Sequence, residues 1–179
     1  MLFRETKLSP ACILEPEPIS DNRGFFARVW DQKEFAERGL TPSFVQANMS
    51  FNPAAGTLRG MHYQASPHEE AKIIRCTRGS FYDAIIDLRS NSPTYMQWLG
   101  VELTADNRLA LFVPEGFAHG YQTLEENSEA FYQVSEFYTP GAERGIRWDD
   151  PAFDIEWPEV PSRTISDKDR SWPDFTPTT

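Results

Sequence analysis

The stretch GTLRGMHYQ, residues 56–64, decides the fold when it is read together with PEGFAH, residues 114–119. In the first stretch a glycine is followed by five residues and then His62, and the second has the spacing PxGxxH and ends at His119. Short alternating or apolar runs surround both stretches. Turn signals separate these runs, including Asn52-Pro53, Gly79, Ser92-Pro93 and Pro140-Gly141. Many short strands at nearly regular spacing predict an all-β sandwich or barrel.

Two segments with these spacings, in this order, are typical of the cupin fold, a jelly-roll or double-stranded β-helix barrel that often holds a metal ion. Such an ion needs about three imidazoles plus a carboxylate. Here Tyr63-Gln64 follows His62, where a metal-binding cupin has a second histidine, and the remaining histidine, His68, lies in a charged loop. The sequence therefore predicts a cupin pocket with no metal site and no other cofactor.

The composition indicates one domain over residues 1–179 and limits its partners. A chain with 40% hydrophobic and 13% aromatic residues has enough apolar surface for one core. The formal net charge of −10 argues against binding to nucleic acid or to an anionic membrane. The N-terminal residues include Arg4, Glu5 and Lys7 and form no apolar run long enough for a signal peptide or a membrane span, so we expect a cytoplasmic protein.

Two segments stand apart from the strand pattern. The stretch DQKEFAERGL, residues 31–40, predicts a short N-terminal helix with Asp31 as N-cap and Gly39 as stop. The tail after about residue 147 contains three tryptophans that would be costly to leave in water: Trp148, Trp157 and Trp172. We therefore expect the C-terminal tail to wrap around the barrel.

The residues around His62 indicate proton chemistry at carbon. A pocket that has a base but no Lewis acid must stabilise negative charge by other means, and Lys72, on the next predicted strand, can do so. A lone histidine is more often a hydrogen-bonded core residue, but Arg59, Gln64 and Lys72 nearby favour the functional interpretation. In an ideal strand Arg59 and His62 point to opposite faces, so both serve one site only if Gly60 marks a bulge.

The predicted strand over residues 129–138 carries Tyr132 and Tyr138 with the same parity, six residues apart. Their Cα atoms would lie roughly 20 Å apart at about 3.3 Å per residue. Two aromatic side chains on one face would bind opposite ends of an elongated ligand. Aromatic residues in strands, however, often only pack against neighbouring side chains. The parity pattern alone leaves both interpretations open.

Stretches in order along most of the chain resemble those of the dTDP-4-dehydrorhamnose 3,5-epimerase family of deoxysugar biosynthesis. The most specific are LRGMHYQ (58–64) and PEGFAHG (114–120), and the others are DNRGFF (21–26), FVQANMS (44–50), AKIIRCTRGSFYDAIIDLRSNSPTY (71–95), FYQVSEFYTP (131–140), GIRWDDP (145–151) and SDKD (166–169). The resemblance implies a homodimeric cupin that binds a nucleoside diphospho-4-keto-6-deoxyhexose. The segment CILEPEPI, residues 12–19, resembles the arm that family members add to the sheet of a neighbouring subunit.

By position, the resemblance implies four catalytic residues: His62 as general base, Asp169 as the carboxylate that orients it, Lys72 at the enolate oxygen, and Tyr132 as the acid on the opposite face of the sugar. It also implies substrate contacts. Tyr138 resembles the aromatic that stacks on the pyrimidine, and Arg59 and His119 resemble sugar and diphosphate contacts. The remaining substrate-binding positions are Arg23, Phe26, Gln46, Asn48, Glu143 and Lys168.

Departures from the family pattern leave the substrate open. Arg28 stands where the family usually has a glutamate, Glu70 replaces a usual glutamine, and Met49 replaces a small or polar residue. The main prediction is conversion of dTDP-4-dehydro-6-deoxyglucose to dTDP-4-dehydrorhamnose, and the alternative is a mono-epimerase on another substrate, for example a CDP-linked ketosugar. A metal-dependent cupin oxygenase or isomerase is disfavoured by the missing second histidine, and a non-catalytic binding module is disfavoured by the complete catalytic set.

Overall fold

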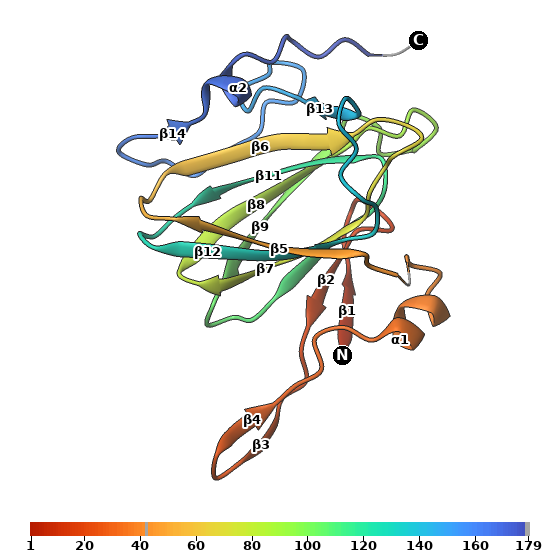
Figure 1. The fold of residues 1–179 in the computed structure, drawn as a ribbon, viewed down its shortest axis with the longest axis vertical. Coiled ribbons are helices and arrows are strands. Elements are labelled where there is room, and N and C mark those ends of the chain that lie inside the picture. The colour runs from red at the N-terminus through yellow and green to blue at the C-terminus, as the bar shows by residue number, and fades with distance from the viewer. Residues whose placement is uncertain (42, 178–179) are drawn as a thin grey trace.

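Two β-sheets face each other in the computed structural model, which describes residues 1–41 and 43–177 (Figure 1). The first sheet contains, in spatial order, β1 (Leu2–Glu5), β2 (Cys12–Glu15), β10 (Ala110–Val113), β7 (Lys72–Arg78), β12 (Ser128–Val134) and β5 (Gln46–Asn52). The second contains β13 (Glu143–Gly145), β6 (Thr57–Gln64), β11 (Phe117–Thr123), β8 (Ser80–Asp87) and β9 (Trp98–Thr104), with β14 (Thr164–Ile165) parallel to β6. From β5 to β13, successive strands lie in alternate sheets except for the paired strands β8 and β9, and the predicted all-β jelly roll is confirmed.

The main hydrophobic core fills the space between the two sheets. It includes Ile74 from the first sheet and Phe81, Ile85 and Tyr121 from the second, each at most 4% exposed. Phe81 and Tyr121 also pack ring against ring, with centroids 4.9 Å apart. Burial of such large apolar side chains between two packed sheets is the main source of stability in a fold of this kind.

Part of the outer face of each sheet is also covered. The helix α1 (Gln32–Glu37) buries Phe35 completely against Phe112 on the first sheet, with ring centroids 5.6 Å apart. The C-terminal tail packs Ile146 and Phe153 against Met61 on the outer face of the second sheet. Figure 1 shows this tail lying across β6, so it wraps the barrel as the sequence predicts.

The predicted N-terminal helix is present, and its start is capped as expected. The Asp31 side chain accepts hydrogen bonds from the amides of Lys33 and Glu34, and Gly39 adopts a left-handed φ of +67° beyond the last turn. A second helix, α2 (Asp167–Arg170), falls in the SDKD motif and was not predicted. No helix among the described residues is long and apolar enough to cross a membrane.

The N-terminal region differs in one respect from the expected exchanged arm. The strand β2 at Cys12–Glu15 pairs antiparallel with β10 of its own chain, so this part of CILEPEPI covers an edge within the chain. A hairpin of β3 (Ile19–Asp21) and β4 (Gly24–Phe26) follows and projects away from both sheets (Figure 1). This hairpin begins at Ile19, the last residue of the segment, and is the part of the N-terminal region left free to reach a neighbour.

Candidate active site

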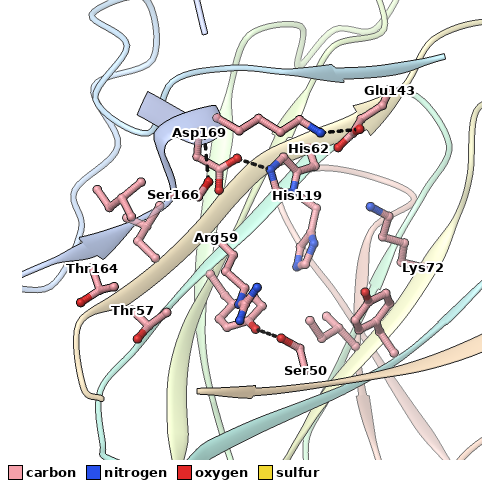
Figure 2. A pocket seen from close by; sticks show the side chains of 16 residues that line it. Ser50, Thr57, Arg59, His62, Lys72, His119, Glu143, Thr164, Ser166 and Asp169 are labelled. Atoms are coloured by element: carbon pink, nitrogen blue, oxygen red, sulfur yellow. Dashed lines mark hydrogen bonds and ion pairs between the residues drawn. The ribbon is translucent and has the colours of Figure 1, made fainter. Parts of the chain in front are cut away.

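A cavity of about 510 Å³ lies between the two sheets and is bordered by α2 (Figure 2). Its polar lining includes Arg59 and His62 from β6, Lys72 from β7, His119 from β11, Tyr132 from β12, and Lys168 and Asp169 from α2. An adjoining cavity of about 260 Å³ shares His62, Lys72, Tyr132 and Glu143 and adds Gln46, Asn48, Glu70 and Tyr138. The four predicted catalytic residues therefore line one cavity, although they are far apart in the sequence.

His62 forms a hydrogen-bonded pair with Asp169, as Figure 2 shows. The Nε2 atom of His62 lies 2.6 Å from Oδ1 of Asp169, and the amide of Gly60 donates to Oδ2 at 3.3 Å. Burial alone would raise the pKa of Asp169, but the hydrogen bond and charge of His62 and the Gly60 amide outweigh it and lower this pKa. A proton held on Nε2 leaves the lone pair of Nδ1 available to accept a proton.

The helix α2 fixes the position of Asp169 relative to β6. Ser166 caps the helix and accepts a hydrogen bond from the amide of Asp169 at 3.1 Å. The strand β14, which precedes α2, pairs with Thr57 and Leu58 at the start of β6. Local capping and strand pairing thus bring a carboxylate from the C-terminal tail to the histidine.

The bulge required for Arg59 and His62 to share one face is present. His62 pairs with His119, whereas Arg59 pairs with Tyr121, so three steps along β6 match two along β11. Gly60 has a φ of +125°, and a Cβ atom there would lie 2.5 Å from Cα of Gly120. Only glycine fits this approach. Both side chains consequently reach the cavity, where Nε of Arg59 donates to Asn52 at 2.8 Å.

Lys72 and Tyr132 lie on neighbouring strands of the first sheet, facing His62 on the second. Lys72 is 8% exposed, and its Nζ atom lies 3.0 Å from Oε1 of Glu70. Burial, together with the neighbouring Tyr121 and Glu70, raises the pKa of Tyr132 above its ordinary value. A phenol in this environment keeps its proton and can donate it.

A second histidine–carboxylate pair, between His119 and Asp83, was missed in the sequence. Nε2 of His119 lies 2.7 Å from Oδ1 of Asp83, which is completely buried. Burial raises the pKa of Asp83, and the charges of His119 and Lys72 oppose this rise. The acidic residue Asp83 inside the apolar run SFYDAII, residues 80–86, is the signal that would have revealed it.

Tyr138 is not on the strand of Tyr132, and the prediction of one strand over 129–138 is wrong. β12 ends at Val134, and the chain then turns, because Gln64, buried at 4% exposure, bonds to the backbone of the loop at Phe137 and Thr139. Tyr138 is 61% exposed. Its amide donates to Oε1 of Gln46 at 3.2 Å, so these two predicted substrate-binding residues still lie together.

Glu143 and Lys168 pair with each other at the edge of the cavity. Nζ of Lys168 lies 2.5 Å from Oε2 of Glu143, and the Tyr138 hydroxyl donates to the same oxygen at 3.4 Å. The hydrogen bond from Lys168 lowers the pKa of Glu143. The pair also ties α2 to β13, beside the site of Asp169.

Arg23 and Phe26 do not reach the cavity of their own chain. Both lie on the β3–β4 hairpin, which projects away from the sheets in Figure 1. The Arg23 guanidinium pairs with Asp21 in the same hairpin, and Phe26 is 64% exposed. A single chain therefore brings together the other eleven predicted site residues and leaves these two outside.

A jelly-roll pocket with a carboxylate-paired histidine on one sheet and an ammonium and a phenol on the other defines a cupin-fold acid–base enzyme. The family is shown by comparison with known proteins. The family model described as dTDP-4-dehydrorhamnose 3,5-epimerase matches residues 5–177, and the chain belongs to this family.

Close similarity to several relatives extends over nearly the full chain. The dTDP-4-dehydrorhamnose 3,5-epimerase of Shigella flexneri is 43% identical over 166 residues, which cover 92% of this chain and 91% of that protein. The crystal structure of the Elizabethkingia anophelis enzyme superposes with a TM-score of 0.94 at 37% identity, covering 98% of this chain and 96% of the other. The Bacillus anthracis enzyme, solved with TDP and pyrophosphate bound, gives a TM-score of 0.92 at 43% identity, covering 97% and 99%.

Proposed function

We propose that this protein is an isomerase that converts dTDP-4-dehydro-6-deoxyglucose to dTDP-4-dehydrorhamnose by inverting carbons beside the 4-keto group. One observation carries the proposal. His62, paired with Asp169 of α2, lies on one sheet, and Tyr132 lies on the facing sheet across a shared cavity. Epimerisation needs a base and an acid on opposite faces of the sugar ring, and two facing sheets supply this arrangement.

Each step of the reaction has a group suited to it. His62 removes the proton on carbon beside the ketone, and the C–H electron pair forms an enolate whose negative charge lies on O4. The Lys72 ammonium stabilises that oxygen. Tyr132 then donates its proton to the carbon from the other face, which inverts the centre, and both groups exchange protons with water before the next cycle.

The main cavity and the adjoining cavity together offer groups for the nucleotide part of the substrate. Arg59 offers a guanidinium for the diphosphate, and the exposed ring of Tyr138 offers a stacking surface for the base. Gln46 and Asn48 line the wall beside Tyr138. TDP is the nucleotide bound in the Bacillus anthracis relative, which supports thymidine as the base recognised by this chain.

The test of this function compares two substrates. We expect a higher kcat/KM with dTDP-4-keto-6-deoxyglucose than with its CDP counterpart, and product ring couplings in the proton NMR spectrum that show inversion. Activity should be the same after treatment with a chelator, because only two histidines are in register for ligation. Greater activity with the CDP sugar, or activity that requires added metal, would contradict the proposal.

The protein is proposed to act as a homodimer. The β3–β4 hairpin exposes Ile19 and Phe26 at 72% and 64%, and β5, an edge strand, exposes Met49 at 64%. An exposed edge strand and an exposed apolar hairpin favour mutual pairing in a twofold dimer. Pairing along β5 would carry the partner subunit's Arg23 and the partner subunit's Phe26 toward Gln46.

We expect light scattering to give a mass of twice 20.5 kDa at micromolar concentration. A mass of 20.5 kDa under these conditions would refute the dimer. We also propose a cytoplasmic location, which the two free, buried thiols of Cys12 and Cys76 support, because free thiols persist in reducing compartments.

A further inference from the structure

Glu70 is a charged residue of the cavity that the proposed mechanism does not use. It lies just before β7 and lines the smaller cavity together with Lys72 and Tyr132. Its side chain is 14% exposed, and Oε1 lies 3.0 Å from Nζ of Lys72, whose side chain is 10% exposed. Gln64 lies 3.5 Å from the other carboxylate oxygen. A carboxylate enclosed to this degree needs a partner, and the Lys72 ammonium provides it.

The ion pair restricts the direction in which Lys72 can donate. A lysine side chain is flexible and carries three donors, so an unpaired ammonium would spread over several positions. Glu70 accepts one of these donors at 3.0 Å. Lys72 lines the cavity, so an oxyanion there can accept its remaining donors. A donor fixed before the reaction stabilises developing charge better than one that must reorient.

The same carboxylate acts on Tyr132. Burial is the main cause of the raised pKa of this phenol, Tyr121 and Glu70 add to it, and Arg59 opposes it. The titratable and charged groups that face Tyr132 come from every wall of the two cavities: Arg59 and His62 on β6, Lys72 on β7, His119 and Tyr121 on β11, Glu143 on β13, Lys168 and Asp169 on α2, and Glu70 and Tyr138 in loops. Among them Glu70 is the carboxylate whose charge favours the protonated phenol.

We propose that Glu70 is a positioning residue of the reaction, which holds the Lys72 ammonium at the enolate oxygen and places a negative charge in the cavity beside the Tyr132 phenol. This inference rests on the proposed epimerase function. It also gives a physical role to one of the departures from the family pattern, since a glutamine at this position would keep the hydrogen bond to Lys72 but remove the charge.

Two variants separate the charge from the hydrogen bond. Glu70→Gln retains an acceptor for Lys72, so KM should stay within about twofold, while the alkaline limb of the kcat profile moves to lower pH. Glu70→Ala also removes the acceptor, and its kcat should fall about tenfold at every pH. The matched control is Glu69→Gln, which removes the same charge from the neighbouring residue, whose side chain lines a separate cavity with Tyr95 and Trp172.

An unchanged alkaline limb in Glu70→Gln, or an equal shift in Glu69→Gln, would overturn the inference. The phenol can also be followed without substrate, by NMR titration of tyrosine labelled with carbon-13 at Cζ, with Tyr132→Phe used to assign the signal. The midpoint for Tyr132 should be lower in Glu70→Gln than in the unaltered protein. An unmoved midpoint rejects the role of Glu70 whatever the activity. A moved midpoint in a protein that does not turn over dTDP-4-keto-6-deoxyglucose rejects the epimerase function instead.

Discussion

His62→Ala should abolish both epimerisation and exchange of the sugar C–H protons with solvent, because no enolate forms without the base. Loss of a positioned proton-transfer group typically costs about 10²–10⁴-fold in rate. The loss here should lie at the upper end of this range, since the described cavity places no other imidazole against Asp169. Proton NMR in deuterium oxide measures both quantities in one sample, as new ring couplings for inversion and as disappearing C3 or C5 proton signals for exchange.

His68→Ala is the matched control for this variant. His68 lies in the loop before β7, outside both catalytic cavities, and its Nδ1 atom is 3.4 Å from the Thr139 hydroxyl. Its removal should leave inversion and exchange unchanged. Exchange in His62→Ala at the rate of the unaltered protein would show that another group removes the proton.

Tyr132→Phe should separate exchange from inversion. The enolate still forms, because His62 and Lys72 are intact, and the histidine can return a proton to the face from which it was taken. Deuterium should therefore enter the sugar while inversion falls by about 10²–10⁴-fold. The phenol lies on the sheet opposite His62, so its loss removes the proposed donor from that side of the cavity.

Tyr82→Phe provides the corresponding control, because it removes a phenol from β8 that lines neither catalytic cavity and instead packs against Trp157. It should invert the sugar at the normal rate. Inversion at the normal rate in Tyr132→Phe would instead assign this tyrosine to packing alone and leave the acid unidentified.

The sequence predicts the fold and the histidine positions well because spacing in strands is a local property. The segments ending at His62 and His119 place both residues on adjacent, paired strands, and the N-cap at Asp31 follows from a local hydrogen-bonding pattern. The bulge at Gly60 could also be predicted from the sequence, because Arg59 and His62 have opposite parity along the strand and were both expected in one site.

Other features depend on contacts between distant segments and could not be predicted in this way. β12 ends at Val134 because Gln64, far away in the sequence, holds the following loop. The pairing of Asp83 with His119 depends on the register between β8 and β11. The family resemblance implied that Asp169 acts on His62. The structure adds that the packing of the C-terminal tail brings the two residues together.

The most direct test of the central claim is the deuterium content of the product formed in deuterium oxide from dTDP-4-keto-6-deoxyglucose by the unaltered protein. If His62 removes the proton and Tyr132 returns one from the opposite face, every inverted carbon should carry one deuterium. Both the imidazole and the phenol exchange their protons with solvent before they act. Inverted product that retains its original C–H protons would contradict the account, since inversion would then proceed without transfer of the proton to His62.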